Sequence, residues 1–406
     1  MRTFAPFLGF LLLLGVLLQL DFLFYILYVL AGLWLLARFG FGRSLQRLHW
    51  QRRFADHAFL GDQAVVEVAV QHRGRLPLPW LKISDSVPIA LFGGDQARVL
   101  TSLAGGERFT LRYTLDCNRR GLYTLGPLTL SGGDPLGFFE TTFSLPGEMQ
   151  LTVYPQILPL PTLGLDSRQP FGVLRSRQRL FEDPARLAGT RDYRTGDSIR
   201  RIHWKASAHS ASLQVKKIDP AIALESALLL NLNQEDHHAR SWRGTSEWAI
   251  VLAASLAHHL SQAGQAVGLQ VHGVDPYEPS QQPRALPPRA GHAHLMQVLE
   301  VLARVSAAPM PATTAWLQQA GLDLDWGTTL LVITPQATAE TSAALHQWRR
   351  RGCAVILLIT EPYAHFDLVQ RHARQLGLHA FNITHEGDLQ RWISSRSPLS
   401  SLTSPG

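Results

Sequence analysis

Residues 224–232 read LESALLLNL, and this short run decides the fold of the C-terminal half of the chain. It is almost entirely apolar, which is typical of a strand buried on both faces. Further apolar runs lie at 266–272, 328–334, 353–360 and 379–384, and amphipathic helical patterns lie between the runs at 246–263, 292–305, 337–350 and 364–376. This alternation predicts a parallel, doubly wound α/β domain over residues 218–394. The Pro-rich segment 275–291 is expected to be a long loop, and 395–406 a disordered tail.

The N-terminal stretch 4–37 is almost unbroken in its apolar character, with Gln19 and Asp21 near its middle. A single long helix would place the Asp21 carboxylate at the centre of a bilayer, where it is costly. A hairpin of two short spans instead places both polar residues at the turn. We therefore expect residues 1–53 to form a transmembrane hairpin followed by a basic juxtamembrane segment. The positive flanks predict that the chain lies in the cytoplasmic (inner) membrane with its soluble domains facing the cytoplasm.

In the middle of the chain, residues 54–160, hydrophobic residues recur at every second position. Residues 108–115 place Phe109, Leu111 and Tyr113 on one face and polar residues on the other, as in a half-buried strand. Other short runs separated by turn residues lie at 64–71, 78–83, 121–130, 138–143 and 151–154. Such spacing predicts a small antiparallel β-sandwich. The two cysteines, Cys117 and Cys353, fall in different predicted domains, which excludes a disulfide scaffold.

Positive charge gathers in residues 161–217, which we interpret as a basic linker between the two domains. The chain has 38 Lys and Arg against 31 Asp and Glu, and the linker contains many of the arginines. Guanidinium groups pair with carboxylates or phosphates through two parallel hydrogen bonds, so one interpretation is a surface for an acidic protein, an anionic lipid or a nucleic acid. The other is an internal network in which Asp192 and Asp197 satisfy the arginines while Trp204 packs between domains.

Part of the linker resembles a known signature. The candidate binding residues are Arg191, Tyr193, Gly196, Asp197, Arg200, Arg201, Trp204 and Lys205. Together with residues 119–123, 126–127 and 134–137, they resemble the bacterial family called domain of unknown function 58. The resemblance implies a von Willebrand factor A-like C-terminal domain and an association with MoxR-type AAA+ ATPases or envelope enzymes.

A von Willebrand factor A-like domain implies a divalent cation held by an Asp-x-Ser-x-Ser motif after the first strand. Here the corresponding positions are Asn231, Asn233 and Glu235, a degenerate set. Neutral amide oxygens are weaker ligands for a hard cation than carboxylates. We therefore expect no metal, while Glu235, Asp236, Thr245 and Ser246 leave weak binding open. His237 and His238 are expected to lie in a solvated loop.

Nucleotide-binding, nucleophile and zinc-protease motifs are absent from the sequence. The leading hypothesis is therefore a membrane-anchored, non-enzymatic adaptor that binds a protein such as a MoxR-type AAA+ ATPase. Two alternatives remain. One is a metal-dependent binder or enzyme at residues 231–236, and the other is a binder of anionic lipid or nucleic acid through residues 166–217, with nucleic acid the weaker option because no DNA- or RNA-binding motif accompanies the charge.

Overall fold

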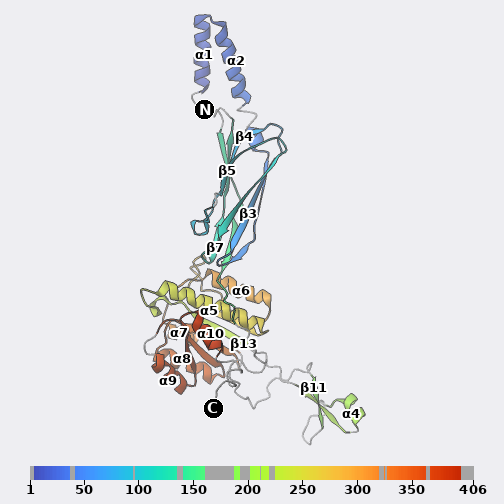
Figure 1. Cartoon of the computed structure of the whole chain (residues 1–406), viewed down its shortest axis with the longest axis vertical. Helices are drawn as coiled ribbons and strands as arrows, with labels where there is room; N and C mark the ends of the chain where they lie inside the picture. Colours follow the sequence, from blue (N-terminus) through green and yellow to red (C-terminus); the bar gives the residue numbers. More distant parts are fainter. Residues whose placement is uncertain are drawn as a thin grey trace. The chain divides into compact units, whose positions relative to one another are not determined.

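The computed structural model describes residues 4–36, 42–94, 97–134, 140–160, 187–192, 202–210, 212–218, 225–319, 324, 327–362 and 366–394. The chain divides into two compact units. The first contains Met1–Gln156 together with Leu302–Arg304, and the second contains Ile157–Val301 and Val305–Gly406. Each unit is described by itself (Figure 1).

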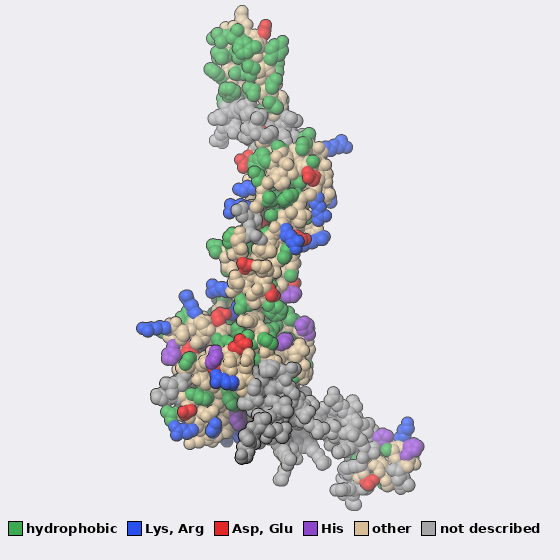
Figure 2. Space-filling model, in the orientation of Figure 1, with side chains coloured by type: hydrophobic (Ala, Val, Ile, Leu, Met, Phe, Trp, Pro, Cys, Tyr) green, Lys and Arg blue, Asp and Glu red, His purple; other side chains and the backbone are tan. Residues whose placement is uncertain are grey.

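The chain begins with two apolar helices, α1 (Phe4–Leu18) and α2 (Asp21–Leu36), which pack against each other. Gln19 has a φ of +48° at the turn between them, and Gly15 allows a close approach to Leu23 and Phe24 of α2. Hydrophobic side chains cover much of the outer surface of the helix pair (Figure 2).

The predicted transmembrane hairpin is wrong. The turn at Gln19 divides the apolar stretch into helices of 15 and 16 residues, which at about 1.5 Å per residue are shorter than the roughly 30 Å of a bilayer core. Among the described residues, no helix is both long enough and apolar enough to cross a membrane.

The rest of the first unit is a β-module, preceded by the short helix α3 (Gly42–Leu45) and containing a 3-10 turn at Ile89–Leu91. Its strands are β1 (Leu48–Arg53), β2 (His57–Phe59), β3 (Gln63–His72), β4 (Leu78–Asp85), β5 (Arg98–Leu103), β6 (Arg108–Asp116), β7 (Gly121–Leu125), β8 (Leu128–Gly133), β9 (Glu140–Leu145) and β10 (Met149–Tyr154). They form three sheets in the orders β1-β3-β6, β5-β4-β8-β9 and β2-β10-β7.

One hydrophobic core lies among these sheets. The alternation predicted for β3 and β6 is present, because Val66, Val68 and Val70 are buried and β3 pairs antiparallel with β6. All pairs are antiparallel except β2 with β10, which run parallel. The single run predicted at 121–130 is divided into β7 and β8 at Gly126–Pro127, and β1 and β5 add strands that the sequence analysis did not predict.

Arg52 holds the β-module together from its interior. Its side chain and that of Asp85 are fully buried, and the guanidinium donates from Nε and Nη2 to the two oxygens of Asp85 at 3.0 and 2.5 Å. Nη1 donates to the carbonyls of Leu125 and Gly147. Tyr113 adds a hydroxyl hydrogen bond to Asp85, and burial together with this carboxylate raises the pKa of Tyr113. The sequence analysis placed Arg52 in a basic juxtamembrane segment, whereas the structure places it in β1 with its side chain buried.

The second unit is built on a six-stranded sheet in the order β15-β14-β13-β16-β17-β18. The strands are β13 (Glu225–Asn231), β14 (Ala266–His272), β15 (Leu286–Arg289), β16 (Thr329–Thr334), β17 (Ala354–Ile359) and β18 (His379–Asn382). Five of them run parallel, close to the predicted bounds. β15 is an antiparallel edge strand within the segment predicted as a loop, and its prolines suit an edge position because a proline has no N–H for the ladder.

The helices of this unit are α5 (Trp242–Gln262), α6 (His292–Arg304), α7 (Thr313–Gln319), α8 (Ala339–Arg350), α9 (Phe366–Gln375) and α10 (Glu386–Ser394). α5 packs on β13 and β14, while α7, α8 and α9 bury their apolar faces in a core shared with β16 and β17. Leu228 and Leu230 point to one face of the central strand, and Ala227 and Leu229 to the other, and all four are fully buried. Burial on both faces explains why the four residues at the centre of this strand are all apolar.

The described part of the predicted linker is structured. β11 (Leu187–Asp192) pairs antiparallel with β12 (Gln214–Ile218), and the short helix α4 (Trp204–Ser210) lies between them in the chain. The described part of the segment 161–217, which was predicted to be a basic linker, therefore contains regular secondary structure.

We expect Asp85→Ala to destabilise the β-module by about 3–5 kcal/mol, because it leaves the Arg52 guanidinium buried without its carboxylate. Hydrogen exchange of the amides in β3 and β6, measured by mass spectrometry, reports this loss. Glu67→Ala is the matched control, because Glu67 pairs with Arg112 at 3.8 Å on the surface, where removal costs less than about 1 kcal/mol. Equal protection in the two variants would show that the buried pair contributes nothing special.

Candidate functional site

Polar side chains gather where the parallel strands end. Asn231 is the last residue of β13, His272 the last of β14 and Thr334 the last of β16, while Glu361 follows β17 by two residues. Because neighbouring parallel strands end at the same edge of a sheet, these residues are brought together, and ligands of open α/β sheets bind at this edge. We call this set and its hydrogen-bonded neighbours the carboxyl-edge network.

Asn231 is the centre of one half of the network. It is fully buried, and its Nδ2 donates to Asp236 Oδ2 at 2.7 Å and to Thr334 Oγ1 at 3.1 Å. Its Oδ1 accepts from the backbone N–H of Asn233 at 2.9 Å. The partners fix the orientation of the amide, because a backbone N–H only donates and a carboxylate only accepts.

The loop after β13 is held by the same side chains. Asn233 caps the 3-10 turn Gln234–Asp236 by accepting from the backbone N–H of Glu235, and it also accepts from the N–H of Met310 at 3.0 Å. Thr313 Oγ1 donates to Asp236 Oδ2, which therefore receives both a hydroxyl and an amide hydrogen bond. Two uncharged donors of the protein itself thus hydrogen-bond to the Asp236 carboxylate.

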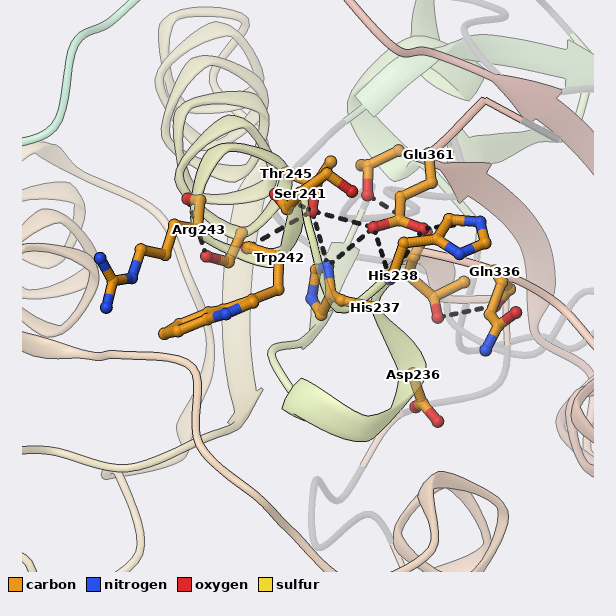
Figure 3. A network of polar contacts seen from close by, with 12 residues as sticks. Asp236, His237, His238, Ser241, Trp242, Arg243, Thr245, Gln336 and Glu361 are labelled. Carbon is orange, nitrogen blue, oxygen red and sulfur yellow. Dashed lines mark hydrogen bonds and ion pairs between the residues drawn. The ribbon is translucent and has the colours of Figure 1, made fainter.

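Glu361 is the centre of the other half (Figure 3). It is 2% exposed, and its two carboxylate oxygens accept from the backbone N–H of His238 at 3.1 and 3.3 Å. Thr245 Oγ1 donates to Glu361 Oε1 at 3.0 Å and accepts from His237 Nδ1 at 2.8 Å. The exposed ring of His238 places Nε2 3.6 Å from Glu361 Oε2.

Burial favours the neutral form of two histidines of the network. Burial lowers the pKa of His237, against the opposing attraction of Glu361, and burial likewise lowers the pKa of His272. The ring of His272 stacks on Trp316 with 4.7 Å between centroids and 7° between planes. His237 Nε2 is buried and has no hydrogen-bond partner among the described residues, which is consistent with a neutral ring that donates only from Nδ1.

The residues at this edge do not fit a divalent cation. Such a cation needs oxygen atoms that converge on one point, but the Nδ2 donor of Asn231 lies between the oxygens of Asp236 and Thr334. Asn233 uses its oxygen on two backbone N–H groups, and Glu235 is exposed. Within the described residues, no group of three or more His, Cys, Asp or Glu is arranged to hold a metal ion.

The candidate residues of the signature are only partly described. Tyr193, Gly196, Asp197, Arg200 and Arg201 lie outside the described residues, and Arg191 is described through its backbone in β11. Trp204 and Lys205 begin α4, and Trp204 is 65% exposed.

Sequence reasoning missed Glu361 and Thr313 and misplaced His237. His237 is buried, so its expected position in a solvated loop is wrong, whereas His238 is exposed as expected. The one signal for Glu361 was an acidic residue directly after a buried strand, at the edge where such sheets bind ligands. Thr313 begins a helix that had not been predicted.

The fold and the site together define a class: a parallel α/β domain with an antiparallel edge strand, whose carboxyl edge is filled by its own side chains. Residues 189–360 match the model of the family described as "Protein of unknown function DUF58". The match supports the assignment of residues 189–360 to this family.

A Bacillus subtilis (strain 168) relative, "Uncharacterized protein YeaD", is 25% identical over 265 residues, which cover 64% of this chain and 62% of that protein. Among solved structures, the CARDB domain of PF1109 from Pyrococcus furiosus is similar over 26% of this chain and 94% of that one, with 18% identity and a TM-score of 0.20. Trypsin-activated alpha-2-macroglobulin from Escherichia coli is similar over 27% of this chain and 7% of that one, with 16% identity and a TM-score of 0.23. Structural similarities with TM-scores this low do not indicate a function.

We expect Asn231→Asp to create affinity for Mg²⁺ or Mn²⁺, because it replaces the amide donor that faces Asp236 with a second carboxylate. Without metal the two carboxylates repel, so the variant should melt below the wild type and recover when Mg²⁺ is added. Calorimetry and thermal melting measure both effects. Asn233→Asp adds the same charge where the oxygen already accepts from backbone N–H groups, and it should bind no metal. Metal binding by the wild type would contradict our conclusion that the residues at the carboxyl edge do not fit a divalent cation.

Acid should destabilise the α/β unit through His237 and His272. Because their folded-state pKa values are lowered, the unfolded chain binds more protons below about pH 6.5, and stability falls as the pH decreases through this window. Urea midpoints from circular dichroism at about pH 7.5 and about pH 5.5 should differ less in His272→Gln than in the wild type. His292→Gln, at an exposed histidine outside the network, serves as the control. An unchanged pH dependence in His272→Gln would contradict this assignment.

Proposed function

We propose that this protein is a non-enzymatic adaptor that binds a protein partner through the described part of its family signature. The observation that carries the proposal is the exposure of Trp204 at the start of α4. Tryptophan is among the residues most enriched at the energetic centres of protein interfaces. Exposure of a large apolar side chain to water is unfavourable in free energy, and a partner that covers the side chain removes this unfavourable contribution.

The exposure of Trp204 follows from a well-ordered local structure. On one side of it in the chain, Ile202 is buried against Val215 of β12, and His203 donates its backbone N–H to Gln214 O at 2.7 Å. On the other side, Ala206 N–H donates to His203 Nδ1, and Ser207 Oγ accepts from Gln214 N–H at 2.8 Å. These contacts fasten α4 to β12 while the indole stays outside.

The carboxyl edge supports an adaptor over an enzyme. The acids and hydroxyls that could serve as acid, base or nucleophile are engaged with one another, as in the contacts of Asp236 with Asn231 and of Glu361 with Thr245. The partner we propose is a MoxR-type AAA+ ATPase, which the resemblance to the family implies.

The test is direct binding of the full chain to a purified MoxR-type AAA+ ATPase by biolayer interferometry. We expect Trp204→Ala to weaken binding by about 2 kcal/mol or more, which is over tenfold in Kd. Tyr277→Ala is the matched control, because Tyr277 is also exposed, at 48%, but lies outside the signature. The proposal fails if the wild type does not bind, or if the two variants bind as the wild type does.

A further inference from the structure

Two neighbouring helices of the α/β unit bring their last turns together. α8 and α9 contact each other, and Figure 1 shows them side by side. His346 Nδ1 of α8 donates to the carbonyl of Leu376, just after α9, at 3.1 Å. A Cβ at Gly377 would collide with the guanidinium of Arg349, so this group lies directly over the end of α9. The two helix ends therefore form one continuous surface.

This surface is strongly basic. Five exposed arginines lie in or directly after these two helices, and we call them the α8–α9 arginine cluster: Arg349, Arg350, Arg351, Arg371 and Arg374. No ion pair joins any of the five to a carboxylate within the part of the chain that the structure describes. The contact of Arg371 with Asp367 is a hydrogen bond from Nε to the backbone carbonyl at 3.4 Å and does not involve the Asp367 carboxylate.

Stabilisation of helix ends explains only part of this cluster. A cation in the last turn interacts favourably with the helix dipole, and Arg351 also lies over the ring of Trp348 at 4.9 Å. These effects do not require five guanidinium groups on one surface, where each repels the others. The remaining positive potential is relieved by an anionic partner.

The neighbouring side chains favour a protein over a nucleic acid as that partner. Leu368 is 56% exposed, and on α9 it lies one turn before Arg371 and His372, on the same face. Binding of single-stranded nucleic acid relies on exposed aromatic rings that stack on bases. Trp348 is buried and Phe366 is half-buried, so α8 and α9 present an aliphatic side chain beside the charges instead.

We propose that the α8–α9 arginine cluster binds an acidic protein segment whose carboxylates pair with the guanidinium groups and whose apolar side chain covers Leu368. Planar guanidinium groups suit paired hydrogen bonds to carboxylates. This inference rests on the proposed adaptor function, and it supplies a second contact surface for the partner, separate from Trp204.

The probe is a fluorescein-labelled peptide of about twelve glutamates with one central leucine, titrated with the full chain and followed by fluorescence anisotropy. We expect binding that weakens as salt is added, and a loss of at least about tenfold in Arg350→Glu/Arg374→Glu. The matched control is Arg240→Glu/Arg284→Glu, which changes the net charge equally at exposed positions of the same unit and should retain affinity within about twofold. Circular dichroism verifies that both variants are folded, and Arg350→Gln/Arg374→Gln replaces the first variant if it is not.

Three results would overturn the proposal. The first is an equal loss in the control variant, which would show an effect of net charge alone. The second is tighter, cluster-dependent binding of an oligothymidylate of equal charge, which would make the surface a nucleic-acid site. The third is equal affinity for a peptide without leucine together with no effect of Leu368→Ala, which would remove the apolar contact.

The result of the peptide experiment can be distinguished from the result of the ATPase-binding experiment. Trp204→Ala should leave binding of the glutamate peptide unchanged, because Trp204 is not part of the cluster. Loss of ATPase binding in Trp204→Ala without any peptide binding would reject the cluster alone. Peptide binding without any binding of the ATPase would reject the proposed partner alone.

Discussion

The carboxyl edge depends on the hydrogen bonds that the side-chain amide of Asn231 makes. This amide stands at the end of the central strand, fully buried, and it must find partners for both its oxygen and its nitrogen. It does so by joining the loop after β13 to the end of β16 through Asp236 and Thr334. The amide nitrogen of Asn231 donates to the carboxylate of Asp236. In a site that binds a metal, a cation would be expected to contact this carboxylate instead. Here the edge is closed by the protein itself.

In the β-module, too, a buried polar side chain must find hydrogen-bond partners. Arg52 is as buried as Asn231, and four hydrogen bonds to Asp85 and to two carbonyls compensate the removal of its charge from water. In both units, buried polar groups tie together strands that are distant in the sequence. The groups left available to a partner lie on the surface instead, at Trp204 and at the ends of α8 and α9.

Local patterns predicted one unit well and the other only in part. Buried parallel strands such as β13 contain an unbroken apolar run, here residues 227–230, so they stand out in a single sequence. β1 contains His49, Gln51, Arg52 and Arg53, and its charged residues resemble a membrane flank when its partner strand is unknown. β15 contains two prolines, which suggest a loop until the pairing with β14 is known. The apolar helices were found, but their turn at Gln19 leaves each too short for the span that was predicted.

The sequence by itself determined the alternation of strands and helices, the family signature and the missing acid at Asn231, because each is local in the chain. Only the tertiary structure decided that Glu361 would meet His238, 123 residues away, and that Thr313 would reach Asp236. It also decided that the arginines of α8 and α9 would share one surface. The reason is physical: the order of strands in the sheet sets which strand ends and helix ends are neighbours, and no local pattern records that order.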